Sequence, residues 1–553
     1  MPLSRRSLVI TGVSGGALIA IPGMAYTDFR SHAELPTDPF TLGVASGDPT
    51  PDGFVLWTRL APDPLVDEGT GGMPARDFKV KWQVSTDEKF SDIVASGAAN
   101  ATPKWGHSIH IEVDGLDSAT EYYYRFRTGK WVSPVGRTRT TPTKNAKVDS
   151  LTMAFVSCNM YEHGYFNGYR YLAEEAPELI LHLGDYTYEY GPNEYVAAGG
   201  NVRQHIGEQT FSLASYRRRQ AQYKMDADLQ AAHHAAPWVV VWDDHEVDNN
   251  WADEFYEKPE IPQPDFLERR ENAFRAYYEN MPLRRTSVPR GIDMQLYRRF
   301  SWGRLANFHM TDTRQYRDDQ ACGDGWKACR EAYNPERSIT GQEQEDWLIR
   351  GFHKSSARWD FLGNQVFFCQ RDADRGPLKT GAMDVWDGYV ASRNRIQQGW
   401  TDAGVRNAIV LTGDVHSAWA AELKEDYDNP DSKNVGVELV ASSVSSAGNG
   451  ADSIPEDNPF LKINPHVKFY NGQRGYVTTR ITEEKMDVKF KVTPNVRTAE
   501  TVIYTRQSYE IADGEHKLHE TYRREVDKSK KLEKFDADDP TKGLEEDADD
   551  LVG

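Results

Sequence analysis

Short apolar runs follow one another between residues 36 and 142, separated by Gly, Pro and Asp. Runs of this length, rich in β-branched and aromatic residues, are typical of strands joined by tight turns. They cover residues 53–60, 78–86, 107–113 and 121–129. The pattern therefore predicts an all-β domain over residues 36–142, and the polar loop at 140–148 marks its end.

One corner of this domain has a distinctive sequence, GLDSATEYYYRF. It resembles the Leu-x-x-x-Thr-x-Tyr corner of fibronectin-type sandwiches. Leu116 and Tyr122 are therefore expected to fix a sheet corner, and the domain is expected to be a fibronectin-like β-sandwich.

From about residue 150 the apolar runs alternate with segments of helical periodicity. Such alternation indicates an α/β fold in which sheets and helices form layers. Strands are predicted from the apolar runs at 151–158, 178–185, 238–245, 364–370 and 407–416. Helices are predicted at 215–234 and 264–281. This second domain is predicted to span residues 150–520.

The C-terminal part adds a hairpin and a charged tail. Residues 476–482 and 486–492 flank the tight turn TEEK, which predicts two antiparallel strands. Residues 521–553 are dominated by Lys, Glu and Asp and are predicted to form a charged helix or tail. A helix there could lie near the mouth of a functional site or on the solvated surface, and both alternatives are open.

Four of the predicted strands end in side chains that can bind metal ions. The strand ends carry Cys158 and Asn159, then Asp185 and Tyr188, then Asp243, Asp244, His245, Asp248, Asn249 and Asn250, and then Asp414 and His416. In an open α/β sheet the carboxyl ends of the strands line the functional crevice. These side chains are therefore expected to converge, although they lie far apart in the sequence.

Carboxylates crowded into a partly buried site repel one another unless cations neutralise them. No Lys or Arg lies within these motifs, so metal ions are the expected counter-charge. Thiol, phenol and imidazole ligands suit a transition metal, whereas carboxylate and amide oxygens suit Ca²⁺ or Mg²⁺. Asp185 could be shared by both kinds of ion. Two metals about 3.5–4 Å apart, bridged by a carboxylate and a hydroxide, are typical of phosphoryl-transfer sites.

The chain of 553 residues carries a formal net charge of −19. A phosphate backbone would be repelled by this charge, so non-specific nucleic-acid binding is excluded as a function. Phosphate can still bind where metal ions supply local positive charge.

The first residues have the features of a targeting signal. Arg5 and Arg6 precede a weakly apolar, Gly-rich stretch and a small residue, Ala25, where cleavage could fall. Residues 1–30 are predicted to be a twin-arginine signal peptide, recognised by the export machinery of that route. A membrane anchor is the alternative. Export would make the protein secreted, periplasmic or cell-wall associated, and no stable membrane span is expected after cleavage.

The cysteines fall into different classes. Cys322 and Cys329 are separated by a short loop, and in an exported protein they are predicted to form a disulfide. Cys369 lies in the apolar run 364–370 and is predicted to be a core residue.

The motifs GDYTYEY, WDDHEVDNN, TDTRQYRDDQ and GDVH resemble those of the PhoD-like alkaline phosphatases and phosphodiesterases. The segments FTLGVASGDPTPDGFVLWTRLAP and NPHVKFYNGQRGY fit the same family, so the resemblance covers nearly the whole chain. It implies an N-terminal β-sandwich followed by a four-layer αββα metallophosphoesterase domain, similar to that of purple acid phosphatases. It also implies twin-arginine export and a cofactor set of Fe³⁺ with Ca²⁺, one iron and one or two calcium.

The resemblance further implies a ligand set. The implied iron ligands are Cys158, Asp185 and Tyr188. Asp185 would bridge to calcium, and the other implied calcium ligands are Asp244, Asn249 and Asp414. His416 matches a metal-site histidine of the family, with no indication of which ion it faces.

The hypothesis for the reaction is an in-line attack on phosphorus by a metal-bridging hydroxide or oxide, without a protein nucleophile. Asp185 would be essential because it spans both ions. His245 is the candidate for protonating the leaving oxygen or contacting phosphate, and a purely orienting histidine is the alternative. Arg314 could clamp phosphate with two hydrogen bonds, or it could form a structural ion pair with one of the nearby aspartates.

The predicted function is that of a phosphoric ester hydrolase acting on small phosphate esters. Phosphomonoesters, phosphodiesters and phospholipid head groups are all open as substrates, so a phospholipase D-type phosphodiesterase is one alternative. An exported binding protein with structural metals is an alternative of a different class.

Overall fold

The computed structural model describes residues 35–257, 265–374, 379–453, 458–528 and 530. The predicted signal peptide and the tail beyond residue 530 lie outside the described residues. Among the described residues, no helix has the length and apolar character needed to cross a bilayer.

The N-terminal region is all-β, as its sequence pattern predicts. Its strands are β1 (Val44–Thr50), β2 (Gly53–Arg59), β3 (Phe78–Ser85), β4 (Ile93–Ala101), β5 (Ser108–Asp114), β6 (Glu121–Thr128), β7 (Trp131–Val132) and β8 (Gly136–Arg139). A five-stranded sheet has the order β4-β3-β6-β7, with β8 paired to β6. The other three strands, β1, β2 and β5, belong to a larger sheet.

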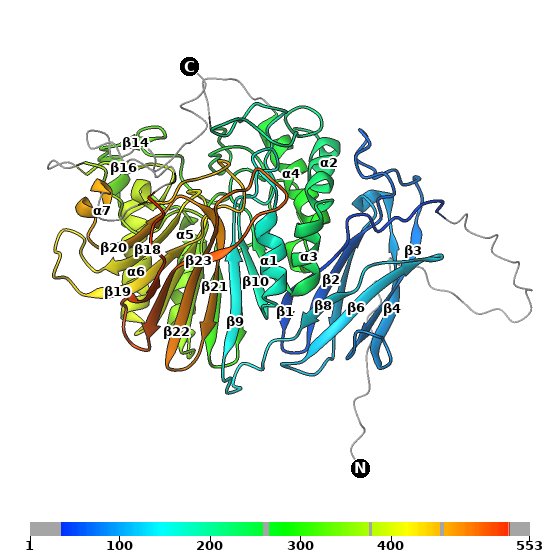
Figure 1. Ribbon diagram of the computed structural model, residues 1–553, viewed down its shortest axis with the longest axis horizontal. Helices are drawn as coiled ribbons and strands as arrows, with labels where there is room; N and C mark the ends of the chain where they lie inside the picture. The colour runs from blue at the N-terminus through cyan, green and yellow to red at the C-terminus, as the bar shows by residue number, and fades with distance from the viewer. Residues whose placement is uncertain (1–34, 258–264, 375–378, 454–457, 529, 531–553) are drawn as a thin grey trace, which may run out of the picture. The chain divides into compact units, whose positions relative to one another are not determined.

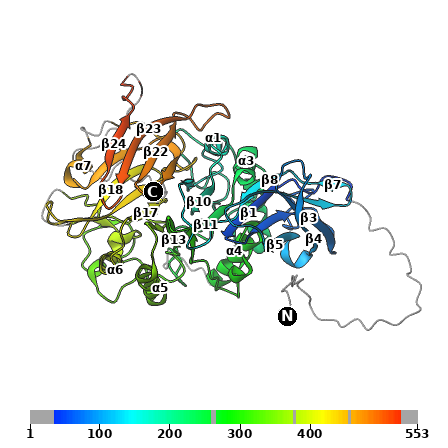
Figure 2. The same ribbon diagram turned by 90° about the horizontal axis from the view of Figure 1, so that it is seen from below.

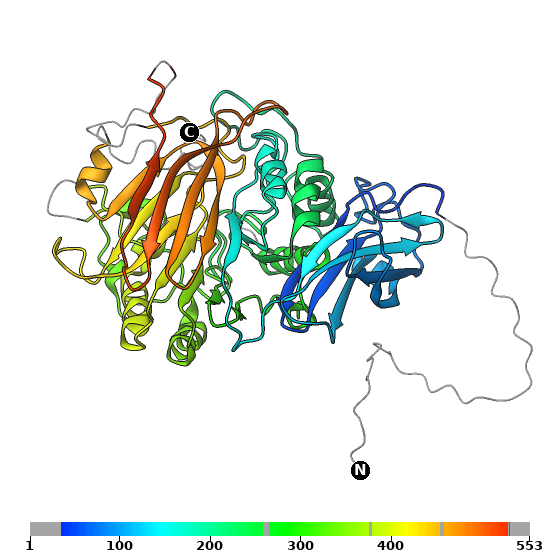
Figure 3. The ribbon, with the colours of Figure 1, turned by 60° about the horizontal axis from the view of Figure 1, so that its bottom comes forward.

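That larger sheet runs from the N-terminal region into the second domain. Its order is β24-β23-β22-β21-β9-β10-β11-β1-β2-β5, with β9 (Leu151–Val156), β10 (Leu179–Leu183), β11 (Trp238–Val241), β21 (Arg474–Ile481), β22 (Lys485–Thr493), β23 (Tyr504–Ala512) and β24 (His519–Arg523). Strand β1 joins β11 in parallel, with Gly47 opposite Trp238. Figure 3 shows the blue N-terminal strands and the orange to red C-terminal strands at opposite ends of this sheet.

The corner predicted from GLDSATEYYYRF is present. Tyr122 is buried, and its hydroxyl accepts a hydrogen bond of 3.0 Å from the Asp117 backbone N–H. Its ring packs against Phe54, with centroids 5.9 Å apart. Leu116 is only half-buried, so the tyrosine is the main fixture of this corner.

A second sheet of seven strands faces the first. Its order is β12-β13-β15-β17-β19-β18-β20, with β12 (Arg298–Trp302), β13 (Ala306–Met310), β15 (Trp359–Gly363), β17 (Ala408–Thr412), β18 (Ala418–Lys424), β19 (Asn434–Val440) and β20 (Val467–Asn471). A small two-stranded sheet pairs β14 (Trp326–Lys327) with β16 (Gly381–Ala382).

The helices lie on the outer faces of the two large sheets (Figure 1). They are α1 (Asn167–Glu174), α2 (Leu213–Lys224), α3 (Ala227–Ala235), α4 (Phe266–Asn280), α5 (Gly341–Lys354), α6 (Val390–Asp402) and α7 (Pro459–Ile463). The short 3₁₀ turns are Pro103–Trp105, Arg285–Ser287, Glu331–Tyr333 and Trp386–Tyr389. Figure 2 shows β22 and β23, then β17 and β18, then α5 and α6 in succession.

Strand β17 shows why these layers form. Successive side chains of a strand point to opposite faces. Ile409 and Leu411 belong to the core between the two sheets, whereas Val410 joins the outer core with Phe352 of α5 and Trp400 of α6. Both faces are thus covered by apolar side chains, which explains the continuous apolar run. The predicted α/β fold with a β-rich N-terminal domain is confirmed.

The prediction of a strand at residues 364–370 is wrong. The strand is β15, which ends at Gly363, and the following residues are buried but irregular. The backbone N–H groups of Phe368 and Cys369 donate to the carboxylate of Glu438, each over 2.8 Å, instead of to a neighbouring strand. The apolar run therefore reports burial, and Cys369 is a core residue as predicted.

Two helix predictions also need correction. The helical segment predicted at 215–234 is two helices. The first, α2, ends at Lys224, and Asp226 caps the second, α3, by accepting hydrogen bonds from Asp228 N and Leu229 N. The C-terminal segment predicted as a helix begins in strand β24, which ends at Arg523.

Candidate metal centre

Predicted ligands follow their strands in a backbone conformation that L-residues rarely adopt. The φ angles of Cys158, Asp185, Asp414 and His416 are +60°, +57°, +68° and +48°. Such conformations cost on the order of 1–3 kcal/mol each and are concentrated at functional sites. Bent in this way, the ends of β9, β10 and β17 bring side chains from the two sheets together.

Two glycines allow the strand ends to approach one another. A Cβ atom at Gly184 would lie 2.5 Å from the Cβ of Asp243, and one at Gly413 would lie 2.6 Å from the Cβ of Ser157. Both distances are shorter than real contacts. Each glycine precedes an aspartate that was predicted as a ligand, so the Gly-Asp pairs combine a close approach with a ligand.

The first cluster contains a thiol, a carboxylate and an imidazole. One ligand atom from each of Cys158, Asp185 and His416 lies within 4.8 Å of the others. Tyr188 Oη donates to Asp185 Oδ2 over 2.9 Å and lies 3.1 Å from His416 Nε2. Ligands that each stand about 2.0–2.3 Å from one transition metal are separated by distances of this order. We refer to Cys158, Tyr188 and His416 as the cysteine side of the site.

Asp185 also belongs to a second cluster, with Asp244 and His245, whose ligand atoms again lie within 4.8 Å of one another. Asp185 Oδ1 and Asp244 Oδ1 are buried and have no hydrogen-bond partner within the described part of the chain. A buried oxygen without a partner is costly, and a cation between these carboxylates would satisfy both. The residues therefore fit a pair of cations that share Asp185.

The two other aspartates of the run 243–250 have different partners. Asp248 forms a buried ion pair with Arg269, with 2.7 Å between Oδ1 and Nη1. Asp243 lies 2.6 Å from Arg314 Nε. Of the three aspartates in this run, Asp244 is the one that joins the second cluster.

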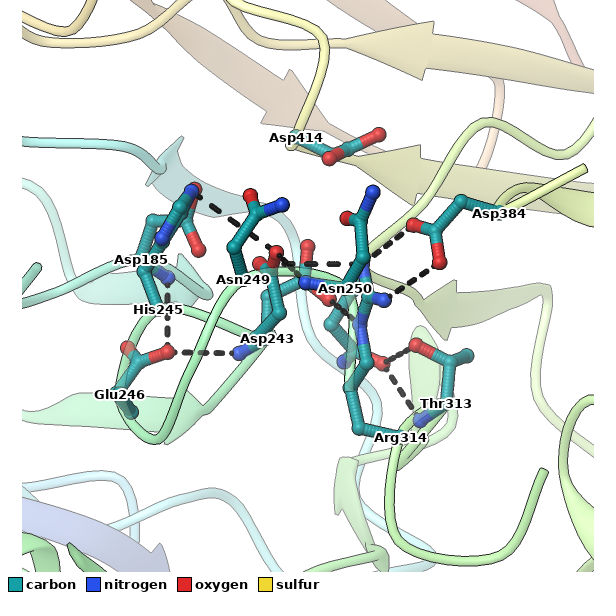
Figure 4. Close-up of polar contacts among 12 residues, drawn as sticks. Asp185, Asp243, His245, Glu246, Asn249, Asn250, Thr313, Arg314, Asp384 and Asp414 are labelled. Atoms are coloured by element: carbon teal, nitrogen blue, oxygen red, sulfur yellow. Dashed lines mark hydrogen bonds and ion pairs between the residues drawn. The ribbon is translucent and has the colours of Figure 1, made fainter. Parts of the chain in front are cut away.

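The two asparagines of this run lie at the partly exposed edge of the site (Figure 4). Asn249 Nδ2 donates to Glu257 Oε1 over 2.8 Å. Asn250 N donates to Asp244 Oδ2, also over 2.8 Å. Figure 4 shows Asp414 entering from the opposite side of the site, above both asparagines. Asn249 and Asp414 thus approach the carboxylate cluster from two sides, as the predicted calcium ligands would.

Arg314 is completely buried beside the second cluster. Its Nε donates to Asp243 Oδ1 over 2.6 Å, and its Nη1 and Nη2 donate to the two oxygens of Asp384 over 2.8 and 2.7 Å (Figure 4). The structure thus shows the ion-pair alternative, with carboxylates remote from Arg314 in sequence. We refer to Asp243, Asp244, Arg314 and Asp384 as the arginine side of the site.

Glu246 fastens two strand ends together. Its carboxylate accepts hydrogen bonds from the backbone N–H groups of Asp185, Tyr186 and Asp243, over 3.2, 2.6 and 2.9 Å. Burial raises the pKa of this carboxyl to about 8. Glu246 therefore fixes the backbone of the ligand residues instead of serving as a ligand itself.

His245 is held in one orientation. Its Nδ1 lies 3.0 Å from Glu189 Oε2, and its ring stacks on Tyr188 with centroids 4.2 Å apart. This arrangement leaves Nε2 on the side of Asp244, 3.9 Å from Oδ2. Burial alone would lower the pKa of His245, but the carboxylates of Asp244 and Glu189 outweigh it and raise the pKa.

The cysteine side favours protonated ligands in the absence of a cation. Burial raises the pKa of the Cys158 thiol and of the Tyr188 phenol, and the charge of Asp185 raises both further. Burial also raises the pKa of Asp185. Ligands must lose their protons to bind metal, so a cation that binds here displaces these protons.

The arginine side has a different electrostatic balance. Burial alone would raise the pKa of Asp244, but the charges of His245 and Arg314 outweigh it and lower the pKa. Burial raises the pKa of Asp243 to about 6, with Arg314 opposing the rise. This side is thus partly neutralised by the protein itself.

The disulfide between Cys322 and Cys329 is present, with an S–S distance of 2.00 Å, which confirms the prediction. Within its loop, Asp324 accepts a hydrogen bond from Asn250 Nδ2. Just before the loop, Gln320 Nε2 donates to Asn250 O over 2.7 Å and to Asp384 Oδ1 over 2.8 Å. The disulfide loop therefore borders the arginine side.

Several residues around the site were not anticipated from the sequence. Glu246 lies within the run DDHEVDNN, between predicted ligands, and this position could have identified it as a site residue. Asp384 and Ser446 lie in segments without any local pattern that points to a site, whereas Arg474 lies in the family-like segment NPHVKFYNGQRGY. His182 of β10 forms a hydrogen bond inside the sheet, with Nε2 2.8 Å from Asn159 Oδ1.

Comparison with known proteins places this geometry in context. The family model of the PhoD-like phosphatases matches residues 153–490, and the model of their N-terminal domain matches residues 26–142. The chain is 48% identical to alkaline phosphatase D of Bacillus subtilis (strain 168), over 90% of this chain and 85% of that protein. A solved structure of PhoD superimposes with a TM-score of 0.87 at 47% identity, covering 90% of this chain and 94% of that one.

Proposed function

Because this chain belongs to the PhoD-like phosphatase family and is therefore a phosphoric ester hydrolase, we propose that it is an exported alkaline phosphatase and phosphodiesterase that uses iron and calcium. The resemblance inferred from its motifs is confirmed by these matches. The alternative of a non-enzymatic binding protein is accordingly set aside. The observation that carries the proposal is the pair of ligand clusters that share Asp185.

On the cysteine side, Cys158, Tyr188 and Asp185 hold one Fe³⁺, with His416 facing the same ion. The mixed sulfur, phenol and imidazole donors support a transition metal. Because burial raises the pKa of the thiol and of the phenol, both groups release a proton when the ion binds.

On the arginine side, Asp244, Asn249 and Asp414 join Asp185 in holding one or two Ca²⁺. The donors there are carboxylate and amide oxygens, which hard cations prefer. The unpartnered oxygens of Asp185 and Asp244 support this assignment. Calcium tolerates a variable number of ligands in a flexible geometry. This also supports the assignment, because Asn249 and Asp414 approach from different loops.

When bound, the cations supply Lewis acidity, charge neutralisation and a water of lowered pKa as the nucleophile. The protein itself supplies no nucleophile in this proposal. Asp185 would be shared by the two ions, and Glu246 holds the backbone of Asp185.

His245 donates the proton that the leaving oxygen needs. Its Nδ1 is occupied by Glu189, and its Nε2 is on the side of the carboxylate cluster. The raised pKa keeps the imidazole charged, which suits a proton donor. For Arg314 the predicted phosphate clamp requires release of Asp384, so we assign it first to holding Asp243 and Asp384 in place.

We further propose that the substrates are small phosphate esters and that the protein leaves the cytoplasm by the twin-arginine route. Arg5 and Arg6 support the route, and residues 26–142 match a domain of the family that precedes the catalytic part. The destination is then secreted, periplasmic or cell-wall associated.

Turnover of an aryl phosphomonoester, an aryl phosphodiester and a phospholipid by the purified protein tests this function. We expect hydrolysis of the aryl esters that is lost on chelation of calcium and restored by adding calcium. Faster turnover of the phospholipid than of either aryl ester would favour the phospholipase alternative. Activity unaffected by chelators would contradict the metal-dependent proposal.

A further inference from the structure

The segment after strand β19 passes beside the cysteine side. Ser446 is completely buried there, and its Oγ lies 2.7 Å from Tyr188 Oη. Its backbone N–H points towards Cys158, whose carbonyl oxygen is 3.3 Å away. Ser446 thus contacts two of the three residues proposed to hold iron, without being a ligand itself.

The direction of the hydrogen bond between Ser446 and Tyr188 is fixed by the other partners of each hydroxyl. The Met160 backbone N–H donates to Ser446 Oγ over 3.0 Å. Tyr188 Oη donates its own proton to Asp185 Oδ2. Since the tyrosine proton is already used, the bond between the two hydroxyls runs from Ser446 to Tyr188.

The position of Ser446 is set by a buried arginine. Arg474 Nη1 donates to Ser446 O and to Ser443 Oγ, each over 2.7 Å, and also to His416 O. Ser443 Oγ in turn donates to Ser446 O over 2.9 Å. Arg474 lies in the segment NGQRGY, which contains none of the predicted metal ligands. It ties the segment of Ser446 to the segment of His416.

We propose that Ser446 is a positioning residue that orients the Tyr188 oxygen on the cation and donates a hydrogen bond to it, with Arg474 holding the Ser446 segment in place. This inference rests on the proposed iron site and deepens it. When the phenol has lost its proton to a cation, the Ser446 hydroxyl remains a donor to the same oxygen. A donor to a metal-bound oxygen withdraws electron density from it and restricts its orientation.

The matched test compares Ser446→Ala with Ser445→Ala. Ser445 is also buried, and its hydroxyl donates to Met160 O over 2.8 Å, so both serines contact the same backbone residue. Of these two serines, only Ser446 has a side-chain hydrogen bond to Tyr188 among the described residues. The readouts are the visible absorption band that a phenolate bound to Fe³⁺ produces, and the rate at which a chelator removes iron.

In Ser446→Ala we expect the band to move to longer wavelength, because the phenolate becomes more electron-rich. Iron loss to the chelator should be about 10- to 100-fold faster, the usual effect of removing an outer partner of a metal ligand. Ser445→Ala should leave both unchanged. In a Tyr188→Phe background, which lacks the phenolate, Ser446→Ala should no longer accelerate iron loss.

The outcomes separate this inference from the proposed function. A wild-type protein with an iron band that Ser446→Ala does not move would overturn the role of Ser446 and leave the iron site intact. Ser445→Ala moving the band as far as Ser446→Ala would also overturn it. A wild-type protein without iron would overturn the proposed cofactor, and the role of Ser446 with it.

Discussion

The two sides of the site solve the problem of buried charge differently. On the arginine side, Arg314 neutralises Asp243 and Asp384 with hydrogen bonds of 2.6–2.8 Å. On the cysteine side, the groups around Asp185 are a thiol and a phenol whose pKa values are raised by burial. The buried arginine there, Arg474, donates to carbonyl groups and to a serine hydroxyl.

The two sides therefore place different requirements on their cations. The arginine side is assembled by the protein's own charges, so its cation completes a framework that already exists. On the cysteine side, Cys158 and Tyr188 retain their protons, and only a cation that displaces these protons assembles a ligand set there. A tightly held Fe³⁺ and a more readily exchanged Ca²⁺ are the combination that we propose.

The largest effect is expected from the residue that both sides share. Asp185→Asn should lower kcat by at least about 10³-fold, because one bridging charge is lost to both cations. The measurement is steady-state hydrolysis of an aryl phosphate ester. Asp248→Asn is the matched control, since Asp248 is a buried acid from a neighbouring strand end whose partner is Arg269. Comparable losses in the two variants would contradict the bridging role of Asp185.

A smaller effect is expected from removing the arginine. Arg314→Met leaves Asp243 and Asp384 without their main counter-charge, and breaking a buried pair costs about 3–5 kcal/mol. The free energy of unfolding, measured by denaturant titration, should fall accordingly. Asp243→Asn added to Arg314→Met should recover part of the loss, because the Asp243 charge that lost its partner disappears, whereas Asp384 keeps its ion pair with Arg317.

The same variant separates the two interpretations of Arg314. If Arg314 were mainly a phosphate clamp, Arg314→Met would raise KM and leave the free energy of unfolding unchanged. We expect instead that the free energy of unfolding falls, and that kcat also falls because Asp244 is held less firmly.

The disulfide loop should affect only the arginine side. Replacing Cys322 and Cys329 together by Ser loosens the loop that carries Asp324, which accepts a hydrogen bond from Asn250. We expect calcium affinity to fall by less than about tenfold, with iron content unchanged. Calcium titration of activity with and without a thiol reductant measures this. The double variant should be insensitive to reductant, and loss of iron on reduction of the wild type would contradict the separation of the two sides.

The smallest effect on activity is expected from Lys224, which lies behind the cysteine side and donates to Tyr186 Oη over 3.0 Å. Burial lowers its pKa from 10.5 to about 7. The unfolded state therefore binds more protons between pH 7 and 10.5, so the cost of burying Lys224 is full below pH 7 and disappears as the pH approaches 10.5.

Lys224→Met removes this dependence. At about 1.4 kcal/mol per pKa unit, the variant should gain a few kcal/mol over the wild type near pH 6.5 and little near pH 10. Urea unfolding at both pH values measures the difference. Parallel pH dependences for the two proteins would rule out a depressed pKa. A large loss of activity at alkaline pH would show that the cysteine side uses Lys224 as a counter-charge.

The sequence allowed the strand ends to be predicted because each apolar run stops at a polar residue. Cys158, Asp185, Asp244 and Asp414 follow such ends, and parallel strands bring their ends to one edge. The prediction failed at residues 364–370, where the apolar content reflects burial, and Glu438 replaces a strand partner.

The residues that support the ligands could not be predicted in this way. Ser446 and Asp384 lie in irregular segments, and their roles depend on contacts with Tyr188 and Arg314 that are remote in sequence. Charge alone indicated that Arg314 could meet either phosphate or a carboxylate. Only the three-dimensional arrangement shows which carboxylates it meets.

The most direct test of the central claim is elemental analysis of the purified wild-type protein beside Cys158→Ala and Asp244→Asn. We expect about one iron and one or two calcium per wild-type chain. Cys158→Ala should lose iron and keep calcium, Asp244→Asn should lose calcium and keep iron, and Cys369→Ala, a second buried cysteine, should keep both. Zinc alone in the wild type, or joint loss of both metals in each ligand variant, would contradict two sides with separate cations.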